Sequence, residues 1–389
     1  MRIIERYPAR YRMLVGRGAW KLLHPVRAII AGIYRLWLFL PGRVREPHHV
    51  SSFREQLLPP DGRPRVISIG NLEVGGGGKT PCTVRIAEGI AARGGRAVVV
   101  ARGYRSAAER CAPCVVPAGH DLPEEGAGSG FVLDEALIAR FRPAPGGPSR
   151  LAAILGDETL LYRERGIPVV IDPVRTRGAE LARHLFSPTH ILLDDAFQNR
   201  SIAKDVEIVL LDAERPFGDG HLLPLGTLRE IPEAVGRADV VLFTRSRGEG
   251  VPPDAQRFVA GKPVFFARHE ACDIVNRRGE IVPLAQLAGR ECVLFSGIAR
   301  PGSFEQTVAS FGARPIVAFR FIDHHEYSGT DVKAILRAGR EGTSFVTTEK
   351  DWHRALGLFP DGVSLFALRI AMRIDDIDGL LDLVFSSSS

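Results

Sequence analysis

Residues 65–80 read RVISIGNLEVGGGGKT, and this stretch decides the fold. Its first half is a short run of β-branched and apolar residues, which is typical of a buried strand. Four glycines and a Lys-Thr pair follow, and a segment of helical composition then extends from Pro81 to about Ala92. Backbone N–H groups of such a loop surround phosphate oxygens, the helix N-terminus adds positive potential, and the lysine and threonine reach the β/γ-phosphates and Mg²⁺. The sequence therefore predicts a phosphate-binding loop made of Gly75, Gly76, Gly77, Gly78, Lys79 and Thr80.

The loop departs from the strict P-loop pattern at one position. That pattern has glycine five residues before Gly78, where this chain has Glu73. The alternative interpretation is a glycine-rich turn followed by an ordinary surface lysine. We favour phosphate binding because the strand, the glycines, the Gly-Lys-Thr triplet and the helix occur in the required order.

Apolar runs of strand length alternate with helix-length segments along most of the chain. One series occupies residues 97–101, 168–172, 190–194, 206–212 and 239–244, and a second occupies residues 264–266, 292–295, 315–319 and 344–347. Continuous apolar runs separated by helices indicate parallel strands that are buried on both faces. We predict an α/β fold, with a P-loop NTPase-like parallel sheet covered by helices on both faces and a second, smaller α/β lobe.

Changes in composition suggest where the domains begin and end. Residues 106–150 are rich in Ala, Gly and Pro and show no sustained period, so we expect a long excursion there. The hydrophilic stretch 245–257 marks the predicted boundary between the two α/β series. We predict an N-terminal segment at 1–50, a P-loop core domain at 51–247 and a second lobe at 248–389.

The net charge of +6 is concentrated at the N-terminus. Residues 1–50 hold ten Lys or Arg and two acidic residues, a local charge of +8, so the rest of the chain is slightly acidic. This distribution argues against nucleic acid binding by the body of the protein. Five cysteines in 389 residues are too few for a disulfide scaffold and indicate a reducing compartment.

Within the basic segment, residues 19–40 combine aliphatic residues with Trp20, Tyr34 and Trp37. Charged residues and a proline interrupt the stretch, whereas a bilayer-spanning helix needs about 20 apolar residues. The pattern instead favours an N-terminal membrane-associating helix that lies on an anionic lipid surface. The alternative is a core helix that caps the first domain.

Acidic and histidine residues outside the loop provide further candidates. Asp194-Asp195 closes an apolar strand, where a P-loop enzyme needs a carboxylate to hold Mg²⁺. The alternative is a solvated strand end, and Asp212 is a weaker candidate for the same metal role. The motifs Gly156-Asp157-Glu158 and Asp323-His324-His325 have no function that spacing alone assigns, and Cys111–Cys114 is a lone CxxC pair.

Taken in order, these motifs resemble the tetraacyldisaccharide 4′-kinase family of lipid A biosynthesis. The similar stretches extend from about residue 65 to residue 351 and read IGNLEVGGGGKTP (69–81), ARGYR (101–105), GDETLLYRERGIPVVIDPVRTRGA (156–179), DDAFQNR (194–200), DVEIVLLDAERPFGDGHLLPLGTLRE (205–230), FSGIARPGSF (295–304), DHHEY (323–327) and TTEKD (347–351).

The resemblance implies an ATP-dependent kinase. It would phosphorylate the 4′-hydroxyl of an acylated disaccharide 1-phosphate lipid, forming lipid IVA, with ATP and Mg²⁺ as cofactors. It would work at the cytoplasmic face of the bacterial inner membrane as a peripheral or monotopic protein. The family fold has two α/β/α lobes with a cleft between them and an N-terminal membrane helix.

The resemblance also implies roles for particular residues. Asp157 would accept the proton of the 4′-hydroxyl, with His324 orienting it or tuning its pKa. Lys79 would hold ATP, Thr80 would hold the metal, and Asp194 and Asp195 would form the second metal-holding motif. Four positions would contact substrate or phosphate, namely Arg175, Asn199, Arg229 and Glu230.

The chain departs from the family pattern at four positions. Ala196 replaces glycine, Asn199 replaces histidine, Arg105 replaces glycine and Thr159 replaces proline. None of these changes removes a phosphate, metal or base position, so we expect an active enzyme. The alternatives are a P-loop NTPase that acts as a membrane-associated switch with water as the acceptor, and a non-catalytic scaffold with a relict loop.

Overall fold

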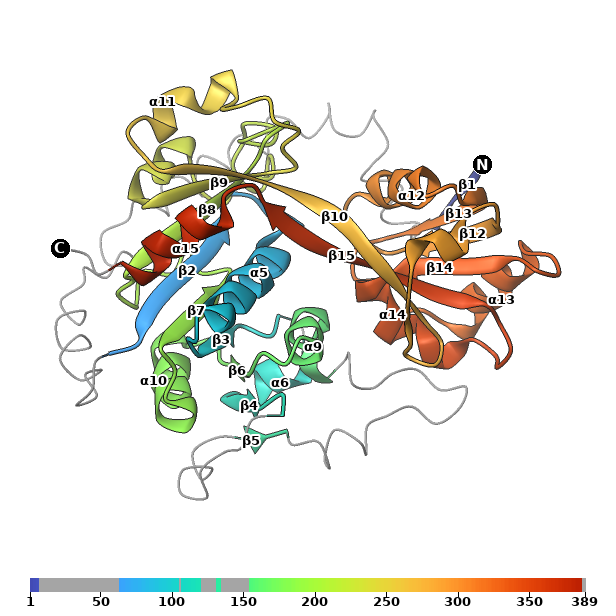
Figure 1. Ribbon diagram of the computed structural model, residues 1–389, viewed down its shortest axis with the longest axis horizontal. Helices are drawn as coiled ribbons and strands as arrows, with labels where there is room; N and C mark the ends of the chain where they lie inside the picture. The colour runs from blue at the N-terminus through green and yellow to red at the C-terminus, as the bar shows by residue number, and fades with distance from the viewer. Residues whose placement is uncertain (7–62, 105, 120–130, 134–153, 387–389) are drawn as a thin grey trace. The chain divides into compact units, whose positions relative to one another are not determined.

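The computed structural model describes residues 1–6, 63–104, 106–119, 131–133 and 154–386 (Figure 1). These residues form two compact units. Unit 1 contains residues 1–6, 154–157 and 270–371, and unit 2 contains residues 63–104, 106–119, 131–133, 158–269 and 372–386. Among the described residues the chain passes between the units at 157/158, 269/270 and 371/372. The domain bounds given by composition stay a prediction.

Unit 2 is built on a mostly parallel sheet. Its strand order is β9-β8-β2-β7-β3-β6-β4-β5, and β4 is the strand that runs antiparallel to its neighbour β6. The bounds are β2 (Arg65–Asn71), β3 (Ala97–Ala101), β4 (Cys114–Val116), β5 (Phe131–Val132), β6 (Val169–Ile171), β7 (His190–Asp194), β8 (Val206–Asp212) and β9 (Val240–Thr244). The strand β2 lies between β7 and β8, so the loop that follows β2 leaves the middle of the sheet at its carboxyl edge, where ligands of such sheets bind.

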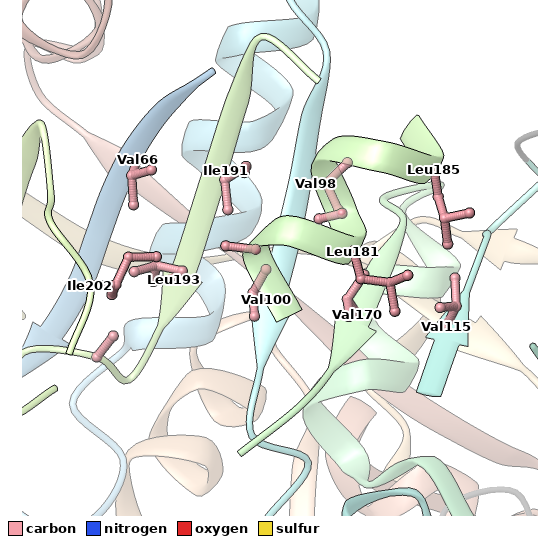
Figure 2. Close-up of a cluster of buried hydrophobic side chains, with 13 residues drawn as sticks. Val66, Val98, Val100, Val115, Val170, Leu181, Leu185, Ile191, Leu193 and Ile202 are labelled. Carbon is pink, nitrogen blue, oxygen red and sulfur yellow. The ribbon is translucent and has the colours of Figure 1, made fainter. Parts of the chain in front are cut away.

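Helices cover both faces of this sheet because its strands are apolar on both sides. Every residue of β7 and β8 is buried. Figure 2 shows α10 (Arg175–Phe186) in front of the strands, with Leu181 and Leu185 packed on valines and leucines of the sheet, and α5 (Lys79–Ala92) behind them. The other helices of the unit are α6 (Ala107–Arg110), α11 (Gln256–Val259), α15 (Ile377–Phe385) and α9 (Asp157–Glu164), whose first residue belongs to unit 1.

Unit 1 is a second α/β body with the strand order β1-β13-β12-β14-β15-β10. The strands are β1 (Arg2–Arg6), β10 (Val264–Asn276), β11 (Ile281–Val282), β12 (Glu291–Ser296), β13 (Arg314–Phe321), β14 (Ser344–Thr348) and β15 (Leu365–Ile374), of which β10 and β15 have residues in both units. Its helices are α12 (Pro301–Ser310), α13 (Gly329–Arg337) and α14 (Glu349–Ala355). A capping box of Ser328 and Asp331 begins α13, and the Thr348 hydroxyl accepts the Asp351 N–H at the start of α14.

The α/β class and the predicted strands are confirmed. The structure adds elements that the sequence did not indicate, namely β1, β15, α9 and α15. Within the expected excursion it describes a short helix and two short strands, and the remainder lies outside the described residues. The N-terminal membrane-associating helix also falls outside them, so it stays a prediction. Within the described ranges, no helix combines the length and the apolar character needed to cross a bilayer.

Candidate active site

The glycine loop of unit 2 joins β2 to α5 and requires glycine for backbone and steric reasons. Gly75 and Gly78 have φ values of +106° and +86°, in the region that side chains disfavour. Gly78 is the N-cap of α5, and a Cβ atom there would lie 2.8 Å from Met372 Cε and 3.2 Å from His269 Cε1. The loop therefore presents backbone N–H groups and the positive end of a 14-residue helix at the carboxyl edge of the sheet.

The Lys79 side chain is folded back over this loop. It is buried, and its ammonium donates to Asn71 Oδ1 (3.2 Å) and to the Gly75 carbonyl (3.4 Å). The Lys79 Nζ atom also lies 3.6 Å from Asp195 Oδ1. The structure thus places the lysine charge directly above the loop, and Thr80 is buried beside it. Lys79 is therefore not the exposed surface lysine of the alternative interpretation, and phosphate binding by these residues stays a prediction.

The departure at Glu73 has a structural explanation. Glu73 does not need a positive φ, and its carboxylate accepts a hydrogen bond from the Thr227 hydroxyl (2.7 Å). Further backbone bonds join Val74 N to the Thr227 carbonyl (2.9 Å) and Arg229 N to the Leu72 carbonyl (2.7 Å). The segment around 227–229 therefore anchors the first half of the loop, a function that its sequence did not suggest.

Asp194 ends β7 with one satisfied oxygen and one unsatisfied oxygen. The Tyr162 hydroxyl donates to Oδ2 (2.7 Å), whereas Oδ1 is buried and has no hydrogen-bond partner among the described residues. Burial raises the pKa of Asp194, and the charge of Glu158 raises it further. A buried carboxylate oxygen without a partner is costly unless a cation or donor reaches it. This oxygen, in register beside the end of β2, fits a Mg²⁺ ligand.

No group of three or more His, Cys, Asp or Glu residues capable of holding a metal occurs in the described part of the chain. That does not conflict with a Mg²⁺ site, because Mg²⁺ keeps several waters and is usually bound through one or two carboxylates and substrate phosphates. The chemistry of the donor set, an Asp194 oxygen and the Thr80 hydroxyl, fits that mode of binding.

Asp195 points to a different set of partners. It has a positive φ of 50°, which Asp tolerates better than most residues, and its Oδ1 accepts from Arg229 Nη1 (2.8 Å). Burial alone would raise the pKa of Asp195, but the positive charges of Lys79 and Arg229 outweigh it and hold the pKa below the usual value. The two adjacent aspartates are therefore not equivalent. Asp194 has a carboxylate oxygen with no partner among the described residues, whereas Asp195 interacts with the charged side chains of Lys79 and Arg229.

Arg229 is a central member of this network. Its guanidinium also donates to the Glu73 carbonyl (3.1 Å), Gln198 Oε1 (3.2 Å) and Asn71 Oδ1 (3.3 Å). Lys79, Asp194, Asp195 and Arg229, all predicted site residues, thus come together at the loop.

Three predicted contact residues are engaged within the protein. Arg175 is 4% exposed and donates to the backbone carbonyls of Asp172 (2.7 Å) and Asp194 (3.1 Å), so it ties the ends of β6 and β7 together. Glu230 accepts two bonds of 2.9 Å from Arg237. The Asn199 side-chain oxygen accepts from the Ser201 N–H (3.0 Å) and hydroxyl (2.9 Å). Their contact with substrate stays a prediction.

The substitution of alanine for glycine at position 196 is also explained. Ala196 is fully buried and does not have a positive φ, because the left-handed turn occurs one residue earlier at Asp195. A methyl group therefore costs no backbone strain there.

Arg245 is a loop contact that sequence reasoning missed. It follows β9 with φ +59°, pairs with Asp212 Oδ2 and donates to the Gly76 carbonyl (2.8 Å). Asp212, the weaker metal candidate, thus holds an arginine that supports the loop. No sequence motif predicts this contact of Arg245, because it depends on the adjacent ends of the paired strands β8 and β9.

In unit 1, Asp157 and His324 form the predicted pair. The Asp157 carboxylate is buried, and its Oδ2 lies 2.9 Å from His324 Nδ1. His324 has a positive φ of 58°, a conformation that often marks functional sites when a non-glycine residue adopts it. The hydrogen bond to Asp157 raises the pKa of His324, and burial partly opposes that rise. The two partners are 167 positions apart in the sequence, which explains why spacing could not pair them.

A third residue, Arg354, meets the same carboxylate. Its Nη2 lies 3.1 Å from Asp157 Oδ2, and its Nη1 donates to the His325 carbonyl (2.9 Å). Burial would raise the pKa of Asp157, but the hydrogen bond from His324 and the charge of Arg354 hold it below the usual value. Asp157 is therefore ionised at neutral pH and able to accept a proton.

The neighbouring His325 has a structural role. Its ring stacks on Phe321 with centroids 4.4 Å apart, and its Nε2 lies 3.2 Å from Asp331 Oδ2. Of the two histidines in the DHH motif, only His324 meets Asp157 in the described structure.

Comparisons with known proteins indicate which family the chain belongs to. A family model described as tetraacyldisaccharide-1-P 4′-kinase matches residues 49–140 and 139–386. A tetraacyldisaccharide 4′-kinase of Anaeromyxobacter sp. (strain Fw109-5) is 37% identical over 299 residues, covering 74% of this chain and 72% of that protein. One from Pelobacter propionicus is 33% identical over 352 residues, covering 89% and 86%.

A crystal structure of LpxK from Aquifex aeolicus in complex with ATP is similar as well. It has a TM-score of 0.62 and 25% identity, covering 94% of this chain and 98% of that one. With a phosphate-binding loop, paired aspartates and an Asp–His pair in place, and with family matches over most of its length, the chain belongs to the tetraacyldisaccharide-1-P 4′-kinase family.

Proposed function

We propose that this protein transfers the γ-phosphoryl group of ATP to the 4′-hydroxyl of a tetraacyldisaccharide 1-phosphate, a step of lipid A biosynthesis. The chain is a kinase of this family, and the reaction is the one that its relatives' names describe. The observation that carries the proposal is the loop itself, where Lys79, Asp194 and Asp195 converge at the carboxyl edge of the sheet.

On the ATP side, phosphoryl transfer needs positioning and neutralisation of charge. The N–H groups of residues 75–78 and the N-terminus of α5 receive the phosphates, and Lys79 neutralises their β/γ oxygens. Asp195 and Arg229 keep the lysine in place from one side, and Arg245 supports the loop at Gly76 from another.

Thr80 and Asp194 would hold Mg²⁺, the Asp194 Oδ1 atom being the ligand that lacks another partner. When bound, the ion supplies positive charge to the phosphate oxygens during transfer.

On the acceptor side, Asp157 removes the proton of the attacking hydroxyl. A sugar hydroxyl is a poor nucleophile, and a positioned base contributes about 10²–10⁴-fold to such a reaction. His324 orients the carboxylate through Nδ1 and keeps it ionised.

We further propose that the protein works at the cytoplasmic face of the bacterial inner membrane. The substrate class is a lipid, and the +8 charge of residues 1–50, with its Trp and Tyr residues, suits an anionic lipid surface.

The test is a transfer assay with labelled ATP, Mg²⁺ and tetraacyldisaccharide 1-phosphate in detergent. We expect a bis-phosphorylated lipid, and we expect Lys79→Ala to lower turnover by about 10²-fold or more because charge developing on the phosphates is no longer neutralised. Lys333→Ala, an exposed lysine of α13, is the matched control and should keep full turnover. ATP hydrolysis at the same rate without lipid, and no labelled lipid, would favour the NTPase switch.

A further inference from the structure

We propose that Arg354 is a positioning residue of the catalytic pair, which holds Asp157 Oδ2 together with His324 so that Oδ1 is the oxygen that accepts the substrate proton. This inference rests on the proposed function for the role of Asp157. The contacts that carry it lie entirely within unit 1.

Two donors share one oxygen of the Asp157 carboxylate. His324 Nδ1 (2.9 Å) and Arg354 Nη2 (3.1 Å) both reach Oδ2, and Oδ1 takes part in neither contact. A carboxylate oxygen that already accepts two donors is a poorer proton acceptor than its partner. The two donors thereby decide which oxygen of Asp157 is the base.

Arg354 also connects the Asp157 carboxylate to the segment that carries His324. Its Nη1 donates to the backbone carbonyl of His325, the residue after His324 (2.9 Å). Arg354 is only 10% exposed in its side chain, so its charge is fixed by these partners and weakly screened by solvent. One guanidinium therefore sets the distance between the base and its orienting histidine.

The helix α14 anchors the same segment a second time. Asp351, fully buried, accepts from Gly297 N (3.0 Å) and from the Thr348 hydroxyl (2.7 Å), and it lies 3.5 Å from Arg354 Nη2. The Gly297 carbonyl in turn accepts the N–H of His324 (3.1 Å). A Cβ atom on Gly297 would lie 2.9 Å from the Ile322 carbonyl, so the segment is packed directly on this glycine.

The charges around the pair determine how it should respond to pH. Asp157 faces His324 from the 322–325 segment and both Arg354 and Lys350 from α14. His324 also faces Asp323, whose Oδ2 is 3.9 Å from Nε2. An opposite charge at this range lowers a carboxylate pKa by about 1–3 units, so removal of Arg354 should raise the pKa of Asp157. The base is then protonated, and inactive, at higher pH than in the wild type.

The experiment compares Arg354→Gln, which removes the charge, with Arg354→Lys, which keeps it. For Gln we expect the acid limb of the kcat–pH profile to move up by about one pH unit or more. For Arg354→Lys we expect the acid limb to stay near its wild-type position, because the positive charge is kept. The kcat value should fall, because one ammonium cannot hold Asp157 and the His325 carbonyl in the same geometry. Arg320→Gln, which breaks another arginine–carboxylate pair of unit 1, is the control and should leave the limb in place.

A second measurement does not depend on turnover. The His324 imidazole is titrated by NMR in the full-length protein, and His324→Gln identifies its signal. Loss of the Arg354 charge should raise the pKa of His324, because Asp157 then interacts with one fewer cation, whereas Arg354→Lys should restore it.

An unmoved acid limb and an unmoved His324 titration in Arg354→Gln would overturn the proposal. Failure of the proposed function looks different, since the wild type would then yield no labelled lipid. Failure of Asp157 as the base would show as full transfer activity in Asp157→Asn.

Discussion

At the residue scale, two neighbouring aspartates of one motif have acquired different tasks. Asp194 has a buried oxygen with no partner in the described part of the chain, and Asp195 binds Arg229 and faces Lys79. The difference arises from the backbone, because the left-handed conformation of Asp195 turns its side chain away from the direction that the strand gives to Asp194.

Substitutions of the two aspartates should therefore change the activity in different ways. We expect Asp194→Asn to raise the Mg²⁺ concentration needed for half-maximal activity about tenfold or more, since an amide is a weaker ligand than a carboxylate. Asp195→Asn should mainly lower kcat, because Lys79 and Arg229 lose their shared anion. Activity measured against free Mg²⁺ distinguishes the two. Equal Mg²⁺ requirements in both variants and the wild type would place the metal elsewhere.

At the scale of elements, the helix that begins at the phosphate loop depends on the far end of the chain. The helix α15 packs on α5 in unit 2, where a Cβ atom on Gly89 would lie 2.6 Å from Leu381 Cδ1. The Arg93 guanidinium at the end of α5 pairs with Asp378 and Asp382 of α15. The residues Leu380, Leu381 and Val384 are buried, so the contact between α15 and α5 is an apolar interface supplemented by these two ion pairs.

Truncation of that interface should destabilise unit 2. Leu381→Ala should cost about 2–5 kcal/mol, the range found when a buried leucine is removed from a close-packed core. The measurement is urea unfolding, in which the midpoint of each variant is compared with that of the wild type. ATP binding is measured on the same variants. Val174→Ala is the control, because Val174 of unit 2 is 50% exposed and its truncation should cost far less. Similar losses in the two variants would mean that α15 contributes little to the unit.

At the scale of the whole molecule, the N-terminal residues combine two features that an experiment must separate. Arg2–Arg6 form β1, which pairs in parallel with β13 in unit 1. The predicted membrane-associating stretch at 19–40 lies outside the described residues. Deleting the N-terminus would remove an edge strand together with the basic segment, so charge reversal is the cleaner test.

We expect Arg27→Glu with Arg35→Glu to weaken binding to anionic vesicles about tenfold or more, since each basic residue near such a surface contributes about 1 kcal/mol. Co-sedimentation at low and high salt is the measurement. Reversal of Arg215 and Arg247, two exposed arginines of unit 2, is the control and should leave binding unchanged. Unchanged binding in the Arg27/Arg35 variant would assign lipid contact to another surface.

Local sequence was sufficient to predict the elements whose own residues follow a recognisable pattern. Apolar runs predicted the strands from 65–71 to 344–348, because a strand buried on both faces must be continuously apolar. The order of strand, glycines and Lys79-Thr80 predicted the loop, because its conformation requires glycine at Gly75 and Gly78. The motifs in order were also sufficient to indicate the family.

Only the tertiary structure decided the contacts between distant residues. The contact of Arg354 with Asp157, the return of α15 to α5, and the support of the loop by Arg229 and Arg245 join residues that lie far apart in the chain. A side-chain hydrogen bond between distant residues produces no periodic pattern in the sequence. Its partners can be identified only once the positions of the strands and turns are known. The structure also shows bonds from Glu230, Asn199 and Arg175 to the protein's own backbone and side chains. The contact with substrate that the resemblance implies for these three residues stays a prediction.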